Sequence, residues 1–297
     1  MTFHSGFVAI SGRPNVGKST LLNRVLAQKI AIMSPKAQTT RNKIQGIYNE
    51  PDMQIVFIDT PGIHKPKNQL GERMNRTAIS ATRGVEVILW IVDVTEAIGS
   101  GDEYVLSQLG NQEAPIFLVL NKIDLVDRIM VEERKREWLN LHPFPQIYPI
   151  SAREGTQVDA LMQGIKKYMP EGPKYYPDGQ TSDHPEVFIM AELIREKILM
   201  FTREEVPHGV AVIIERNQIN KNGTVEVDAA IIVERESQKG IVIGKNGNML
   251  KKIGTMARIE MESLLGSKVL LHTFVRVESN WRNDNKYLNE FGYREEQ

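Results

Sequence analysis

The sequence predicts an α/β protein in which a mostly parallel sheet, with helices on both faces, precedes a smaller α+β domain. Residues 7 to about 169 alternate short apolar runs with helical patterns, which is typical of a sheet covered by helices. Residues 171–186 are rich in proline and glycine and lack a helical period, which predicts a linker. Beyond them the order of elements changes. We therefore predict domains at 1–170 and 187–297, joined by the linker 171–186.

Composition fits a globular protein with two cores and excludes several classes of site. The chain of 297 residues is long enough for two domains. Its formal net charge of zero produces no global field that would favour nucleic acid or an anionic membrane. The absence of cysteine excludes disulfides and thiolate metal sites, and it fits a cytosolic protein. The most apolar run, Val87 to Val92, is bracketed by Glu86 and Asp93, so we expect a strand there and not a membrane span.

In the first domain, apolar runs predict strands and the periodic stretches between them predict helices. The strands are expected at Phe7–Ile10, Ile44–Asn49, Gln54–Ile58, Val85–Val92, Ile116–Leu120 and Ile147–Pro149. The helices are expected near 18–28, 69–82, 102–110, 130–140 and 156–168. In such sheets ligands bind at the carboxyl ends of the strands. The polar motifs that follow these strands are therefore the candidate site.

A phosphate-binding loop follows the first predicted strand. Its residues fit the pattern G-x-x-x-x-G-K-[ST], and the strand before it and the helix after it argue against a chance match. Backbone N–H groups and the helix dipole would point at one small volume, which suits phosphate. Lys18 is expected to reach the β- and γ-phosphates, and the Ser19 hydroxyl is expected to ligate Mg²⁺. The loop consists of Gly12, Arg13, Pro14, Asn15, Val16, Gly17, Lys18 and Ser19.

A second motif, Asp59-Thr60-Pro61-Gly62, follows the third predicted strand. A carboxylate at that position can hold Mg²⁺ through water, and the Gly62 N–H can meet the γ-phosphate. The same four residues would also fit a plain turn. Because they follow a phosphate-binding loop, we interpret Asp59 as a metal ligand. The next residue is Ile63, at the position where Ras-like enzymes place a glutamine that orients the attacking water. Because an apolar side chain cannot orient water, we expect slow hydrolysis, at ~10⁻⁴–10⁻³ s⁻¹ or modestly above.

A third motif, Asn121-Lys122-Ile123-Asp124, indicates guanine as the base. Asp124 can accept hydrogen bonds from the N1–H and 2-amino groups of guanine, donors that adenine cannot supply. Lys122 would pack its stem over the base, and Asn121 would brace the loop. Ser151-Ala152, after the last strand, would offer a backbone N–H to guanine O6. Each string alone would fit a solvated turn, but in this order they favour GTP over ATP.

The second domain shows helix, strand, strand, helix, glycine turn, helix and strand, which is the order of a type II KH domain. The first helix is predicted by the spacing of Ile189, Leu193, Ile194, Ile198 and Phe201. The two strands that follow are joined around Asn222-Gly223, a strong hairpin signal. The strands are expected at Val210–Ile214, Val225–Val233 and Lys268–Val277, a long helix at 248–265, and a polar helix at the C-terminus.

In this order Gly244–Gly247 is the G-x-x-G loop, which clamps the backbone of about four nucleotides of single-stranded nucleic acid. Six basic residues and one acid lie between Arg235 and Arg258, although 171–297 carries 17 Lys and Arg against 20 Asp and Glu. Such a run is usually a solvated face, but its clustering around the loop favours a stripe that tracks phosphates. Ile243 lines the groove for bases or fills the core. The candidate RNA-binding residues are Lys239, Ile243, Gly244, Lys245, Asn246, Gly247, Lys251, Lys252 and Arg258.

The ordered motifs resemble those of the translation-factor-related GTPases, and Lys36-Ala37-Gln38-Thr39-Thr40-Arg41 looks like the switch I of the Era family. The resemblance covers essentially the whole chain. It implies GTP or GDP with Mg²⁺ as cofactors, and Thr40, in preference to Thr39, as the γ-phosphate and Mg²⁺ sensor. Asn15 either helps to coordinate a stimulating K⁺, as in potassium-activated relatives, or only caps the loop. The implied metal ligands are Ser19, Thr40 and Asp59, and the implied catalytic residues are Asn15, Lys18, Thr40, Asp59 and Gly62.

The same resemblance implies binding near the 3′ end of 16S ribosomal RNA and a role in assembling the 30S subunit, in the cytoplasm. Peripheral contact with the inner face of the plasma membrane is a family property that no lipidation motif or basic amphipathic helix indicates here. We expect no DNA partner, and a monomer is the default. The alternative is a membrane-associated or cell-cycle signalling GTPase whose KH fold binds protein. A GTPase subunit of an RNA-modifying complex is disfavoured, because 187–297 contains no second catalytic constellation.

Overall fold

The computed structural model describes residues 2–36, 38–110, 112–203 and 206–294. Ala37, in the predicted switch I, and residues 295–297, in the predicted second domain, lie outside the described residues. Contacts divide the chain into two compact units. The first comprises Met1–Ala31, Thr40–Lys67 and Gly71–Asp183, and the second comprises Ile32–Thr39, Asn68–Leu70 and His184–Gln297. Two short segments from the first half of the sequence therefore group with the second unit.

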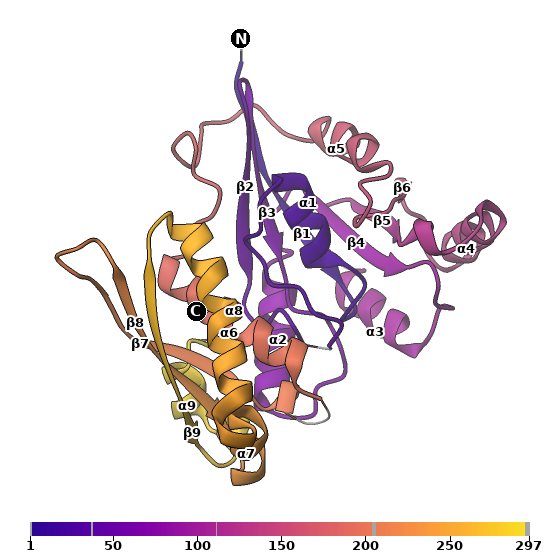
Figure 1. Ribbon diagram of the computed structural model, residues 1–297. Helices are drawn as coiled ribbons and strands as arrows, with labels where there is room; N and C mark the ends of the chain where they lie inside the picture. The colour runs from indigo at the N-terminus through magenta and orange to yellow at the C-terminus, as the bar shows by residue number, and fades with distance from the viewer. Residues whose placement is uncertain (1, 37, 111, 204–205, 295–297) are drawn as a thin grey trace. The chain divides into compact units, whose positions relative to one another are not determined.

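The first unit is built on a six-stranded sheet with the strand order β2-β3-β1-β4-β5-β6 (Figure 1). All pairings are parallel except that of β2 with β3. The mostly parallel sheet is thus confirmed. Its strands are β1 (His4–Gly12), β2 (Ile44–Glu50), β3 (Met53–Asp59), β4 (Val87–Asp93), β5 (Ile116–Asn121) and β6 (Gln146–Pro149).

Helices pack on both faces of this sheet, which explains why its strands are continuously apolar. On one face, Trp90 of β4 packs edge-on against Trp138, with ring centroids 5.0 Å apart. On the other, Gly46 of β2 lies so close to Leu22 and Leu26 that a Cβ would be 2.8 and 2.5 Å from their methyl groups. The helices are α1 (Lys18–Leu26), α2 (Gln69–Ser80), α3 (Ser100–Leu109), the 3₁₀ turn η1 (Ile123–Leu125), α4 (Arg128–Leu141) and α5 (Val158–Lys166).

Part of the predicted linker is tied to the first unit. Backbone N–H groups of Tyr175 and Tyr176 donate to Gln54 Oε1 of β3 at 2.8 and 2.9 Å. The Tyr175 ring also contacts Phe7 of β1, with centroids 4.7 Å apart. These contacts explain why the first unit extends to Asp183, beyond the end predicted for the first domain.

The second unit contains a three-stranded sheet in the order β7-β8-β9, with β7 antiparallel and β9 parallel to β8. The chain order of its elements is the one predicted for a type II KH domain, and β7 and β8 form the expected hairpin. The elements are α6 (Glu186–Phe201), η2 (Val206–His208), β7 (Ala211–Ile219), β8 (Val225–Val233), α7 (Glu236–Ile243), η3 (Lys245–Gly247), α8 (Asn248–Leu265), β9 (Val269–Val277), η4 (Trp281–Asn283) and α9 (Asn285–Glu290).

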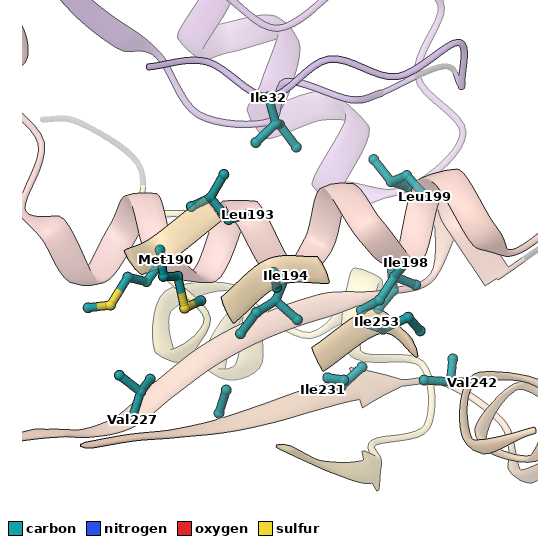
Figure 2. Close-up of a cluster of buried hydrophobic side chains, with 14 of the residues drawn as sticks. Ile32, Met190, Leu193, Ile194, Ile198, Leu199, Val227, Ile231, Val242 and Ile253 are labelled. Carbon is teal, nitrogen blue, oxygen red and sulfur yellow. The ribbon is translucent and has the colours of Figure 1, made fainter. Parts of the chain in front are cut away.

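Helix α6 is buried on more than one side. Figure 2 shows Ile194 and Ile198 directed toward the sheet, while Leu193 points to the opposite side, where Ile32 lies. A helix enclosed in this way is expected to be apolar around much of its circumference. Among the described residues, none of the helices combines the length and the apolarity needed to cross a bilayer.

Candidate functional site

The phosphate-binding loop joins β1 to α1, as predicted, and its glycines are required by its conformation. Gly12 and Gly17 have φ angles of 144° and 104°, a region that favours glycine. A Cβ at Gly12 would lie 2.3 Å from the carbonyl oxygen of Ile91, and one at Gly17 would lie 2.2 Å from Asn121 Nδ2. Helix α1 begins at Lys18, so its first N–H groups and its dipole are available to an anion.

Lys18 folds back over this loop. Its Nζ donates to the carbonyl oxygens of Arg13 at 2.8 Å and Gly12 at 3.3 Å. Burial lowers the pKa of Lys18 to about 8, although the Asp59 carboxylate acts in the opposite direction. A buried ammonium group that is disfavoured in this way gains much from an adjacent phosphate. The geometry therefore fits the predicted role of Lys18 as a phosphate ligand.

Side-chain oxygen atoms of Ser19, Thr40 and Asp59 meet beside Lys18. Ser19 Oγ donates to Asp59 Oδ2 at 2.6 Å and lies 2.8 Å from Thr40 Oγ1. Asp59 is fully buried, and its Oδ1 has no hydrogen-bond partner among the described residues. Burial raises the pKa of Asp59 to about 6, opposed by Lys18 and by hydrogen bonds from Ser19 and Thr40. Hydroxyl and carboxylate oxygens are the ligands that Mg²⁺ prefers, so the donor set fits that ion.

The structure separates the two candidate threonines of switch I. Thr40 belongs to the first unit and its hydroxyl is directed to Asp59 Oδ2 at 3.4 Å. Thr39 belongs to the second unit, and its Oγ1 donates to the carbonyl oxygen of Lys36 at 2.7 Å. Its own carbonyl oxygen accepts a hydrogen bond from Arg195 of α6. Of the two, Thr40 therefore has the geometry of a metal ligand.

The Asp59-Thr60-Pro61-Gly62 motif lies against the phosphate-binding loop. Thr60 Oγ1 donates to the Ile10 carbonyl oxygen at 2.8 Å. A Cβ at Gly62 would lie 2.6 Å from the backbone nitrogen of Pro14, so glycine is required for this close approach. Ile63 donates its backbone N–H to the Gly12 carbonyl oxygen at 3.0 Å, and its side chain is fully buried.

Asn121 contacts both the phosphate-binding loop and the Ser151-Ala152 loop. Its Nδ2 donates to the Val16 carbonyl oxygen at 2.7 Å, and its Oδ1 accepts from the Ala152 N–H at 2.9 Å. It thus braces the phosphate-binding loop as well as the Ser151-Ala152 loop. Asp124 lies in η1 and its side chain is exposed, where it can accept hydrogen bonds from an incoming base.

Sequence reasoning missed two residues that position the base loops. Asp93, at the end of β4, forms an ion pair with the Lys122 ammonium group. Arg24 of α1 donates through Nε to the Ala152 carbonyl oxygen at 3.2 Å. The position of Asp93 at the carboxyl end of a strand was a usable signal, because polar residues gather at those ends. Nothing in the sequence around Arg24 distinguishes it from a solvated helix arginine.

In the second unit, a groove of about 360 Å³ follows the predicted G-x-x-G loop. Gly244 and Gly247 have φ angles of 70° and 75°, and Asn246 has a φ of 55°, so the loop turns sharply into α8. The groove lies between α8 and β9, and three of the predicted RNA-binding residues line it. The lining residues are Gly247, Leu250, Lys251, Gly254, Thr255, Arg258, Leu271 and Thr273.

The remaining predicted RNA-binding residues lie around this groove or away from it. Lys245 and Asn246 are exposed in η3, and Lys239 and Ile243 lie on α7. Lys252 has its Nζ 4.0 Å from the centroid of the Phe201 ring of α6. Lys252 is exposed on α8 and its ammonium group lies over this aromatic ring, so its contact with RNA stays a prediction.

Two family models match the chain. One, described as a 50S ribosome-binding GTPase, matches residues 7–122, and a KH domain model matches residues 205–282. The chain is 54% identical to GTPase Era of Lacticaseibacillus paracasei over 290 residues, which are 98% of this chain and 97% of that protein. It is also 54% identical to GTPase Era of Staphylococcus haemolyticus over 298 residues, with the full length of both chains covered.

Two solved structures share the fold over nearly all of their length. One is Era in complex with MgGDPNP and nucleotides 1506-1542 of 16S ribosomal RNA, and the other is a variant of Aquifex aeolicus Era bound to GDP and AlF4⁻. Each has a TM-score of 0.95 and 41% identity to this chain, and the match covers 98% of this chain and 99% of the other.

Proposed function

The chain belongs to the Era family of GTPases, and from that premise we propose that it is a GTP-driven switch that binds the 3′ end of 16S ribosomal RNA during 30S assembly. The single observation that carries the proposal is that one chain contains two sites of different chemistry. The first is the phosphate and metal site around Lys18 and Asp59. The second is the groove beside Gly247, with Lys251 and Arg258 at its lining.

In the hydrolysis of GTP to GDP and phosphate, the residues of this chain act mainly by holding charges in place. The loop N–H groups and Lys18 bind the β- and γ-phosphates. Ser19, Thr40 and Asp59 hold the metal site, and Mg²⁺, when bound, neutralises charge on the phosphate oxygens. Gly62 packs closely on Pro14 of the phosphate-binding loop, and its N–H would meet the γ-phosphate there.

The rate of this hydrolysis is proposed to be slow without an activator. Ile63 occupies the position of the water-orienting glutamine, and its side chain is buried in the apolar cluster around Trp90. It therefore cannot hold the attacking water. A K⁺ site at Asn15, which lies at φ 65° in the loop, stays a prediction.

RNA would bind as a single strand along the groove of the second unit. The two glycines of Gly244–Gly247 allow its backbone to approach closely, and the exposed Lys245 adds positive charge. The family model whose description names the 50S ribosome matches only residues 7–122. Its description therefore does not bear on this groove. Era bound to the end of 16S ribosomal RNA supports the 30S subunit as the partner.

We also propose that nucleotide and RNA binding influence each other through residues 32–39. This segment groups with the second unit, where the Met33 N–H donates to Glu196 at 2.9 Å. The next residue, Thr40, groups with the first unit and reaches the metal site. A change at Thr40 on hydrolysis would therefore be transmitted along the chain to the segment held by α6.

The direct experiment is binding of the GTP-loaded full chain to an oligonucleotide that copies the 3′ end of 16S ribosomal RNA. A scrambled oligonucleotide and a variant with Lys245→Asp and Asn246→Asp serve as controls, across a salt series. Tight binding to the first RNA alone, lost in the variant, is the expected result. Equal binding to both RNAs would leave a KH module without the proposed target.

Failure of the chain to bind either RNA would favour the second candidate, a signalling GTPase whose KH fold binds protein. Protein contacts that survive ribonuclease treatment would identify that case. We propose a cytoplasmic location. Peripheral membrane association has no support from a described residue and is the weaker part of the predicted localisation.

A further inference from the structure

The first turn of α3 receives the side chain of Arg13 from the phosphate-binding loop. Arg13 Nη1 lies 3.1 Å from Asp102 Oδ2 and 3.1 Å from Glu96 Oε2. The Asp102 side chain is 6% exposed, whereas that of Glu96 is 55% exposed. Because solvent and salt screen an exposed ion pair, Asp102 is the stronger of the two partners. We call Glu96, Gly101 and Asp102 the Arg13 slot.

Gly101 gives this slot the space that the arginine needs. It is the second residue of α3 and its φ is not positive, so the backbone conformation does not require glycine. Glycine in a helix is also less favourable than alanine. A Cβ at Gly101 would lie 2.9 Å from Arg13 Nε and 3.3 Å from Arg13 Cδ. The close passage of Arg13 therefore explains why a glycine is found at this helix position.

The Asp102 carboxylate is held in place by α3 itself. Its Oδ2 accepts a hydrogen bond from the Gly99 N–H at 3.1 Å, which is the contact that caps the start of the helix. The residue is also buried. The carboxylate thus has a second partner that fixes its position, as an anchor for a mobile arginine requires.

The backbone of Arg13 belongs to the phosphate site. Its carbonyl oxygen accepts a hydrogen bond from Lys18 Nζ at 2.8 Å, and the next residue, Pro14, packs closely on Gly62. A loop that is already held in its binding conformation binds a ligand more tightly, because binding no longer has to order it. An anchor on the Arg13 side chain therefore acts on the groups that meet the phosphates.

We propose that Asp102 is a positioning residue for the nucleotide, which holds Arg13 and thereby keeps the phosphate-binding loop in the conformation that receives the β- and γ-phosphates. Asp102 acts through Arg13 and is not itself a phosphate ligand, since two carboxylate oxygens would repel one. This inference deepens the nucleotide-binding part of the proposed function and rests on it.

The first test separates nucleotide affinity from stability with Gly101→Ala in the full chain. Alanine favours the helix, so the melting temperature without nucleotide should be unchanged or raised. Its methyl group displaces the flexible Arg13 side chain from the slot, so the affinity for fluorescent GDP with Mg²⁺ should fall by about two- to tenfold. Gly240→Ala is the matched control, because Gly240 lies inside α7 and has no neighbour within 4 Å among the described residues. That variant should keep its GDP affinity.

The second test is a double-mutant cycle with Asp102→Asn and Arg13→Met. Asparagine keeps an oxygen for the Gly99 N–H, and methionine keeps most of the apolar stem of the arginine. Asp102→Asn should lower GDP affinity by about two- to tenfold in the unmodified chain and have no effect on it in the Arg13→Met chain. Glu103→Gln, the same loss of charge at an exposed residue of the same turn, should leave GDP affinity unchanged.

Equal losses of affinity from Asp102→Asn in both backgrounds would mean that Asp102 supports the fold as a whole, and would overturn the inference. Unchanged GDP affinity after Gly101→Ala and Asp102→Asn would overturn it as well, while nucleotide binding itself stands. Failure of the unmodified chain to bind GDP would instead overturn the proposed function.

Discussion

Single residues in the nucleotide site are placed by the requirements of charge and space. Lys18 and Asp59 are both buried. Burial lowers the pKa of Lys18 to about 8 and raises the pKa of Asp59 to about 6, so it favours the uncharged form of each group. A partner of opposite charge would stabilise the charged form of each group, and the predicted partners are a phosphate for Lys18 and Mg²⁺ for Asp59. Gly62 is needed for a different reason, because its contact with Pro14 leaves no room for a side chain.

The exchange Asp124→Asn should change the base that the site accepts. The asparagine amide cannot accept both hydrogen bonds from guanine, but its NH₂ can donate to the 2-oxo group of xanthine. We expect GTP affinity to fall by about 10²–10⁴-fold and xanthosine triphosphate affinity to rise. Titration with fluorescent nucleotides measures both affinities. Because Asp124 is exposed, the melting temperature should not change, and retained GTP affinity would contradict the assignment.

The exchange Ile63→Gln should not convert this chain into a Ras-like enzyme. The Ile63 side chain is fully buried in an apolar cluster, so a glutamine there would bury an amide without partners. We expect a loss of about 1–3 kcal/mol in the free energy of unfolding and no increase in the single-turnover rate of GTP hydrolysis. A rate increase of tenfold or more would mean that this side chain reaches the attacking water after all.

At the scale of elements, strands and helices are joined by a few polar contacts at the edges of the sheet. Glu50 of β2 accepts hydrogen bonds from Lys166 of α5 and from the Tyr48 hydroxyl, both at 2.6 Å. The Lys166 hydrogen bond, followed by that of Tyr48, holds the pKa of Glu50 below its ordinary value. Tyr48 and Glu50 are two residues apart on the edge strand β2, so both reach the same side.

This pair predicts how the stability of the first unit depends on pH. Because the pKa of Glu50 is lower when folded, its stabilisation is fully present above pH 4.5 and is lost as the pH falls through the folded value. Lys166→Met should therefore reduce the free energy of unfolding at pH 7 by about 1 kcal/mol or less, and by less still at low pH. Urea denaturation at several pH values measures the difference, with Glu50→Gln as the partner variant in a double-mutant cycle. A difference that is independent of pH would exclude this pair as its source.

At the scale of the whole molecule, the chain passes between the two units at more places than the predicted linker 171–186. Residues 32–39 and 68–70 come from the first half of the sequence but group with the second unit. The first of these segments directly precedes Thr40, and the second follows the Gly62 motif by a few residues. Thr40 and the Gly62 motif, the two predicted contacts to the γ-phosphate, therefore each lie within a few residues of a segment that groups with the second unit.

This arrangement predicts a reciprocal coupling between nucleotide and RNA. If a non-hydrolysable GTP analogue changes RNA affinity relative to GDP by some factor, RNA must change the preference for the analogue over GDP by the same factor. We expect a factor of about 5–150, the range of typical couplings. Calorimetric titrations of RNA into each nucleotide complex, and of each nucleotide into the RNA complex, measure both sides. Equal RNA affinity in both nucleotide states would remove residues 32–39 from the proposed switch.

The sequence by itself determined the order of the elements and the local motifs, because these depend on contiguous residues. The strand-loop-helix around 12–19 and the glycine turn at 244–247 are both found where they were predicted. The predicted contacts to nucleotide and RNA stay predictions. Only the tertiary structure decided which distant residues support the motifs. The Asp93–Lys122 ion pair requires β4 beside β5, and the groove at Gly254 requires β9 beside α8. Such pairings depend on how the elements pack, which no local pattern contains.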